Sequence, residues 1–142
     1  MNAKFFISLV LFAFLTVGNL LAINLSPTKT EIAQDITDEI ASAIKSGNSR
    51  GIAAFFTDNV DLKVLNQEDV YSKAQAELIV KDFFAKHPVK NFSIGHRSSK
   101  VDSQFAIGTL ETSNGKYRIT ILLKKSTDRL VVQQFRIESE NE

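Results

Sequence analysis

Residues 72–88, SKAQAELIVKDFFAKHP, decide the fold, because they hold a complete helix with its start and stop signals. Ser72 to Gln75 have the spacing of a capping box, in which the serine and glutamine side chains satisfy free backbone groups at a helix start. The apolar residues that follow occupy positions compatible with one helical face. Pro88 disfavours helical backbone at His87. The stretch therefore predicts a helix that ends just before Pro88.

Downstream of this helix, the sequence predicts an antiparallel sheet. Alternating residues and turn signals define four strands, over residues 91–100, 104–112, 116–124 and 130–138. Asn114 and Gly115 both tolerate the positive φ of a two-residue hairpin loop. A loop at these two residues predicts that Glu111 pairs with Arg118 and that Leu110 pairs with Ile119.

This register gives the central strands a core face and an opposite face. The predicted core face carries Ala106, Gly108, Leu110, Tyr117, Ile119, Ile121 and Leu123. The opposite face mixes polar residues with Phe105, Ile107 and Leu122, which a monomer would expose to water. Such a patch often marks an interface, although single exposed apolar residues are normal. We predict a sheet-to-sheet homodimer through these three residues.

Upstream of residue 72, the sequence predicts two more helices. Residues 28–31 have capping-box spacing, isoleucines then recur every four residues from Ile32 to Ile44, and Gly47 with Asn48 ends the helix. The other predicted elements are a short helix over residues 50–56 capped by Ser49, a strand over residues 60–64 and an extended piece at residues 70–71.

The first 22 residues have the pattern of a secretory signal peptide. Lys4 precedes an apolar run over residues 5–17, and small or neutral residues lead to a cleavage point near Ala22. The run is shorter than the roughly 20 residues that span a bilayer as a helix, and the chain has no cysteine that could carry a lipid. We expect residues 23–142 to be exported, periplasmic or secreted, as a soluble chain without a stable membrane anchor.

Composition excludes several classes of function. Residues 23–142 form one ordinary domain by length, and 17 basic against 16 acidic residues argue against a nucleic-acid binder. Basic residues predominate after residue 86. This distribution indicates a surface that attracts anions or, as we favour, strand edges on which Lys and Arg side chains prevent pairing with other chains. The two histidines, the lack of cysteine and the lack of a glycine-rich phosphate loop predict no metal site, no cofactor and no catalytic triad.

A few residues remain as candidates for a pocket. Asp61, Tyr71 and His96 could move a proton beside a carbonyl if they converge in a cavity, although structural roles are the commoner ones for such residues. Gln133 is predicted on the core face of the last strand, where a buried amide needs partners. The candidate pocket residues are Phe55, Tyr71, Phe83, Phe84 and Gln133.

Two stretches carry a resemblance to known families. Residues 51–62, GIAAFFTDNVDL, look like the segment that joins the second helix to the first strand in the nuclear transport factor 2-like superfamily. Residues 71–77, 82–84 and 87–88 are similar to an exported family, domain of unknown function 4783. The resemblance covers residues 28–138. It implies an α+β cystatin-like cone, in which about three N-terminal helices pack on a curved antiparallel sheet that ends in a β-meander, with a pocket at the wide end and often a dimer through the outer sheet face.

Two functional hypotheses follow. The first is an exported non-catalytic binding or interaction module, homodimeric, that holds a small apolar or weakly acidic ligand or part of an envelope protein. The alternative is a small isomerase or lyase that uses an acid-base pair from Asp61, Tyr71 and His96. An open cavity with converging polar groups favours the enzyme, whereas a cone filled by aromatic side chains argues against it.

Overall fold

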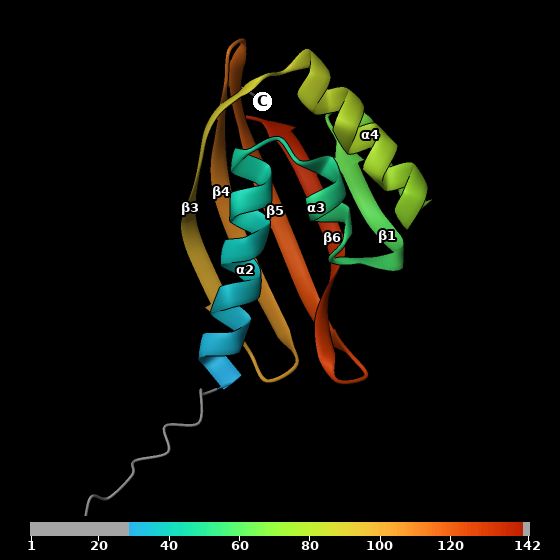
Figure 1. The fold of residues 1–142 in the computed structure, drawn as a ribbon, viewed down its shortest axis with the longest axis vertical. Coiled ribbons are helices and arrows are strands. Elements are labelled where there is room, and N and C mark those ends of the chain that lie inside the picture. Colours follow the sequence, from blue (N-terminus) through green and yellow to red (C-terminus); the bar gives the residue numbers. More distant parts are fainter. Residues whose placement is uncertain (1–28, 141–142) are drawn as a thin grey trace, which may run out of the picture.

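The computed structural model of the chain describes residues 29–140, with side chains from residue 36 onward. Within these residues the chain forms three helices, α2 (Lys29–Lys45), α3 (Ser49–Ala53) and α4 (Lys73–Lys86). The strands are β1 (Phe56–Val64), β2 (Gln67–Ser72), β3 (Val89–Ser99), β4 (Ser103–Thr112), β5 (Gly115–Ser126) and β6 (Arg129–Ser139) (Figure 1). The predicted signal peptide and Thr28 lie outside the described residues.

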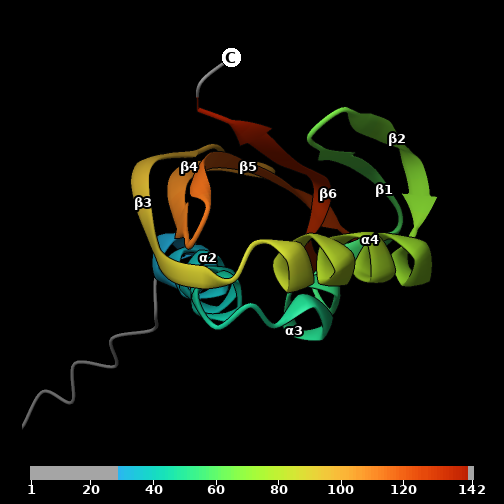
Figure 2. The ribbon, with the colours of Figure 1, turned by 90° about the horizontal axis from the view of Figure 1, so that it is seen from above.

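The six strands form one curved sheet in the order β2-β1-β6-β5-β4-β3. Neighbouring strands are antiparallel except β1 and β6, which are parallel, so the sheet is mixed. All three helices lie on one side of the sheet, and no element of the described chain covers the other side (Figure 2). The predicted α+β fold class, with helices first and a β-meander last, is confirmed.

The helix ends follow the signals in the sequence. The capping box of α4 is complete, because the Ser72 side chain accepts from the Gln75 backbone and the Gln75 side chain accepts from the Ser72 backbone. Helix α2 ends in a Schellman motif, in which Gly47 N and Asn48 N donate to Ile44 O and Ala43 O, at 2.9 and 2.8 Å. Gly47 has a φ of 64°, a conformation that favours glycine.

The predicted cap of the short helix α3 is wrong by one residue. Asn48, and not Ser49, is its N-cap, because the Asn48 side chain accepts from Gly51 N at 2.9 Å. Ser49 is instead the first helical residue and is buried. Asn48 thus closes α2 through its backbone and opens α3 through its side chain, so only residues 46–48 separate the two helices.

The predicted register of the β4–β5 hairpin is also wrong, by two residues. Thr112 pairs with Gly115, so Ser113 and Asn114 form the loop, and Glu111 lies opposite Lys116 rather than Arg118. The Thr112 hydroxyl fixes this loop by donating to Gly115 O at 2.8 Å. Because a shift of two preserves the alternation of a strand, both predicted faces keep their residues.

Gln133 does not face the core as predicted. Leu122 pairs with Gln134 but Leu123 pairs with Val132, so Gln133 is an extra residue in a β-bulge of β6. Its side chain is exposed, while Val132 is buried. The bulge reverses the inward and outward alternation of the strand at this point, and the regular pattern from which the prediction was made could not show it.

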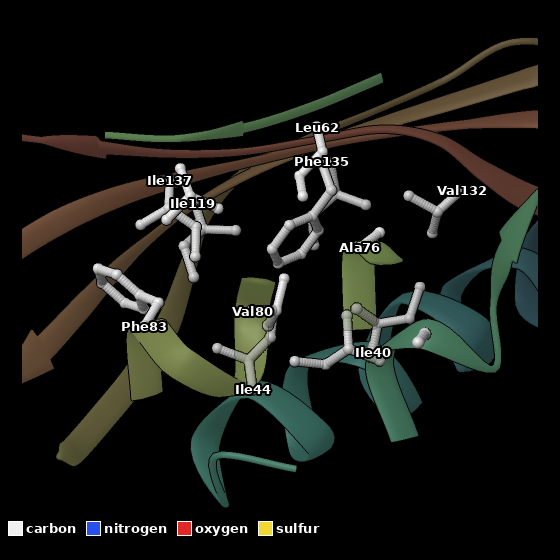
Figure 3. Packing of buried hydrophobic residues seen from close by; sticks show 14 of the residues in the cluster. Ile40, Ile44, Leu62, Ala76, Val80, Phe83, Ile119, Val132, Phe135 and Ile137 are labelled. Carbon is white, nitrogen blue, oxygen red and sulfur yellow. The ribbon is translucent and has the colours of Figure 1, made fainter. Parts of the chain in front are cut away.

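One hydrophobic core fills the space between the helices and the sheet (Figure 3). Ile40 and Ile44 of α2 and Val80 of α4 are fully buried against inward residues of the sheet. The rings of Phe56 and Phe135 lie 5.6 Å apart between their centroids. This packing accounts for the spacing of Ile36, Ile40 and Ile44 in α2 and for the alternating residues of the central strands.

Candidate functional site

The three candidate catalytic residues do not come together. Tyr71 pairs with Val60, whose side chain is in the core, so Tyr71 lies on the helix side of the sheet while Asp61 lies on the opposite side. His96 is exposed on β3, at the other edge of the sheet from β2. The Tyr71 hydroxyl accepts from Gln67 Nε2 at 3.1 Å. No single cavity could contain all three side chains.

The predicted pocket residues are part of the core. Phe83 and Phe84 are 3% and 7% exposed. Phe55 and Tyr71 are half-buried and pack against the same cluster. Gln133 lies outside this group because of the bulge described above. These aromatic side chains occupy the interior that a cone-shaped pocket would need. A filled interior is the arrangement that argues against the isomerase or lyase hypothesis.

The uncovered side of the sheet, here called the open face, carries the predicted apolar cluster. Phe105 of β4 pairs directly with Leu122 of β5, and Ile107 pairs with Thr120. Phe105, Ile107 and Leu122 are each partly exposed. Ser98 of β3 pairs with Phe105 and marks one end of the cluster. The strand alternation therefore gathers three apolar side chains at neighbouring positions of a face without a helix over it.

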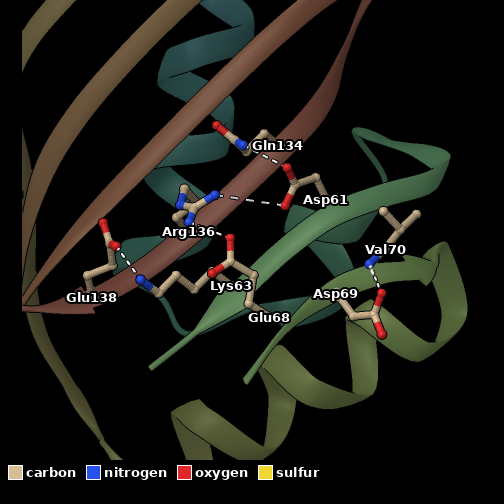
Figure 4. Close-up of polar contacts among 8 residues, drawn as sticks. All are labelled: Asp61, Lys63, Glu68, Asp69, Val70, Gln134, Arg136 and Glu138. Carbon is tan, nitrogen blue, oxygen red and sulfur yellow. Dashed lines mark hydrogen bonds and ion pairs between the residues drawn. The ribbon is translucent and has the colours of Figure 1, made fainter. Parts of the chain in front are cut away.

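Paired charges lie beside this cluster on the open face, because Gln134 and Arg136 of β6 pair with Leu122 and Thr120 of β5. Figure 4 shows these charges. Asp61 of β1 accepts from Gln134 Nε2 at 2.7 Å. Arg136 of β6 lies next to it, with Nη1 3.9 Å from Asp61 Oδ1 and Nη2 2.6 Å from Glu68 Oε1 of β2. One guanidinium thus links three strands of the open face and leaves both neighbouring carboxylates with a partner.

A second ion pair continues the same face. Lys63 Nζ donates to Glu138 Oε1 at 2.8 Å (Figure 4). This hydrogen bond lowers the pKa of Glu138, with smaller contributions from the charges of Lys63, Arg136 and Arg118, against the opposing effect of partial burial. The sequence reading missed this network, because it depends on the parallel pairing of β1 with β6, and no local sequence signal marks that pairing.

A polar junction ties α4 to the β4–β5 loop, and the sequence reading missed it as well. His87 Nδ1 lies 2.9 Å from both Asn114 Oδ1 and the Tyr117 hydroxyl. Asn114 Nδ2 donates to Lys86 O at 3.1 Å. The His87 ring stacks on Phe83 with centroids 4.5 Å apart. These contacts close the carboxyl end of α4, so the geometry gives them a structural role.

No group of three or more His, Cys, Asp or Glu among residues 29–140 is arranged to hold a metal ion. None of the helices in this part combines the length and the apolar character needed to cross a membrane.

Comparison with known proteins gives a family and a fold. The family model described as Domain of unknown function (DUF4783) matches residues 37–138. The crystal structure of a DUF4783 family protein from Bacteroides uniformis is similar, with 32% identity and a TM-score of 0.72, covering 75% of this chain and 99% of that one. A DUF4783 family protein from Bacteroides ovatus has 32% identity and a TM-score of 0.69, covering 73% and 94%.

More distant structures share the fold alone. A domain of unknown function with a cystatin-like fold from Nostoc punctiforme has 9% identity and a TM-score of 0.62, covering 81% of this chain and 79% of that one. No curated protein matches the chain.

Proposed function

The chain belongs to the DUF4783 family, and from that premise we propose that it is an exported, non-catalytic binding module that pairs with a second copy of itself through its open face. The predicted signal peptide supports export. The filled interior and the separation of Asp61, Tyr71 and His96 support a function in binding rather than in catalysis.

The apolar cluster on the open face is the observation that carries this proposal. Phe105, Ile107 and Leu122 belong to two adjacent interior strands of the sheet, β4 and β5, and no helix covers this side of the sheet (Figure 2). A monomer would hold this apolar area in water, at a cost of about 25 cal/mol per Å² relative to burial. Contact with a partner would remove the cost.

A second copy fits this surface better than an unrelated partner, because the surface can meet itself. A two-fold axis through the cluster would place Phe105 and Leu122 against the same residues of the second copy, as in an isologous interface. The adjoining carboxylates of Asp61, Glu68 and Glu138 already have partners in the same chain. They would therefore add little repulsion at the edge of the contact.

Sedimentation velocity on residues 23–142 tests the proposal. We expect the wild type to sediment as a dimer and Leu122→Asp as a folded monomer, because the new carboxylate would lose its hydration in the contact. Leu78→Asp is the matched control: Leu78 is 63% exposed on α4, on the helix side of the sheet, and receives the same change. This variant should remain a dimer.

Two results would contradict the proposal. A wild type that sediments as a monomer at all concentrations would exclude the second copy and leave an envelope protein as the partner to seek. A Leu122→Asp variant that stays dimeric would show that the copies meet on another surface. Far-ultraviolet circular dichroism of each variant shows whether the fold is retained.

A further inference from the structure

A hollow of about 340 Å³ lies on the helix side of the molecule, away from the open face. It is open to solvent and is lined by residues from the carboxyl ends of α2 and α4 and the beginning of β3, which Figure 1 shows at one end of the molecule. Its volume is at the lower end of the roughly 300–1,000 Å³ of small-molecule sites. The hollow is independent of the surface proposed for pairing.

Part of the wall of the hollow is apolar. Phe84 and Ala85 of α4 and Val89 of β3 line it. Gly47 forms another part of the wall, where a Cβ atom would lie 3.8 Å from Val89 Cγ2. The positive φ of Gly47 favours glycine, so the turn after α2 presents backbone here rather than a side chain that would fill the space.

The polar part of the hollow is cationic. Lys45 of α2 and Lys81 of α4 both line it, and neither has a hydrogen-bond or ion-pair partner within the described part of the chain. The carbonyl groups at the ends of α2 and α4 would repel an anion, but those of Ala43 and Ile44 accept from the Schellman motif, and those of Phe83 and Lys86 accept from His87 N and Asn114 Nδ2. The ammonium groups of Lys45 and Lys81 therefore make the polar part of the hollow positively charged.

We infer that this hollow binds a small amphiphilic carboxylate, such as a medium-chain fatty acid. The hydrocarbon part would lie on Phe84 and Val89, and the carboxylate would accept hydrogen bonds from Lys45 and Lys81. Charge-assisted hydrogen bonds of this kind are stronger than neutral ones. The two ends of such a molecule match the two parts of the hollow, whereas a neutral or cationic molecule matches only the apolar part.

Nuclear magnetic resonance titration of residues 23–142 with octanoate tests the inference, with 1-octanol and octylamine as matched probes. Octanoate should give saturable shifts of the backbone amides of residues 45–47, 84–87 and 89. The double variant Lys45→Gln/Lys81→Gln should weaken octanoate binding at least about tenfold, because it removes both charge-assisted contacts. Lys124→Gln/Lys125→Gln makes the same charge change at exposed positions of β5 and should bind octanoate like the wild type.

Equal affinity for octanoate, 1-octanol and octylamine would overturn the inference, because the two lysines would then select nothing. Octanoate binding that survives the change of Lys45 and Lys81, or that shifts only residues elsewhere, would overturn it too. Both outcomes are distinct from a failure of the pairing proposal, since Lys45 and Lys81 lie on the side of the sheet opposite to Leu122.

Discussion

The two faces of the same sheet differ in what covers them. On β5, Ile119, Ile121 and Leu123 point toward the helices and are at most 1% exposed, while Thr120 and Leu122, which alternate with them, lie on the open face and are partly exposed. The apolar side chains of the inner face are therefore buried in the core of the domain. The open face keeps apolar side chains that the fold itself does not use.

Both proposed binding surfaces lie outside the core of the domain. A cone with an open interior would offer a ligand the space between helices and sheet, but here Phe56, Phe83 and Phe135 occupy that space. What remains for recognition is the open face on one side and the hollow at the ends of α2 and α4 on the other. Substitutions on the two faces of the sheet should therefore change the stability of the domain by different amounts.

The largest effect is expected at the centre of the inner face. Phe135→Ala should lower the free energy of unfolding by about 3–5 kcal/mol, because it removes a fully buried ring and leaves a cavity beside Phe56. Ser98→Ala, at an exposed position of the open face, should change it by less than about 0.5 kcal/mol. Urea unfolding monitored by circular dichroism measures both. Equal losses in the free energy of unfolding for the two variants would contradict the difference between the inner face and the open face.

A smaller effect is expected where the inner face has no room for a methyl group. A Cβ atom at Gly108 would overlap the Phe92 ring and lie 2.7 Å from Ser93 O, so Gly108→Ala should cost about 1–3 kcal/mol of stability. Gly95→Ala on neighbouring β3 is the control, because nothing lies within 4 Å of its Cβ position. A neutral Gly108→Ala in thermal unfolding would show that the contact between β3 and β4 is looser than described.

The smallest effect is expected on the open face, and it depends on pH. The pKa of Glu138 is lowered in the folded protein, so its carboxylate stabilises the fold at pH values above the usual pKa of 4.5. This stabilisation is lost as the pH falls through the lower pKa of the folded state. Lys63→Met should therefore destabilise the protein by up to about 1 kcal/mol at pH 7 and by less at pH 3. Urea unfolding at both pH values gives the difference, and a cost that stays constant with pH would exclude this ion pair as its source.

The sequence predicted the elements well where their signals are local. The capping box at Ser72 and the stop at Gly47 depend on neighbours in the chain, and the structure confirms both. The predicted hairpin register was wrong, because the loop is held by side-chain contacts that the alternation of residues does not show, within the loop at Thr112 and to Lys86 O of α4 at Asn114. The prediction that Gln133 faces the core was wrong because nothing in the local sequence pattern marks the extra residue of the bulge.

The candidate binding surfaces could be predicted only in part. Alternation alone brought Phe105, Ile107 and Leu122 to one face, because a strand period of two survives an error of two in register. The hollow could not be found in this way. Lys45 and Lys81 belong to different helices, and only the packing of α2 beside α4 and β3 brings them to the same site.

Electron paramagnetic resonance of a spin-labelled chain tests the central claim, that the open face is where two copies meet, most directly. The chain has no cysteine, so Ser98→Cys gives a single label beside Phe105 at the edge of the apolar cluster. Packed sheets lie about 10 Å apart. We therefore predict dipolar coupling between labels of two copies, at a shorter distance than for a label at Leu78→Cys on α4. No coupling at Ser98→Cys, or a shorter distance from α4, would contradict the account.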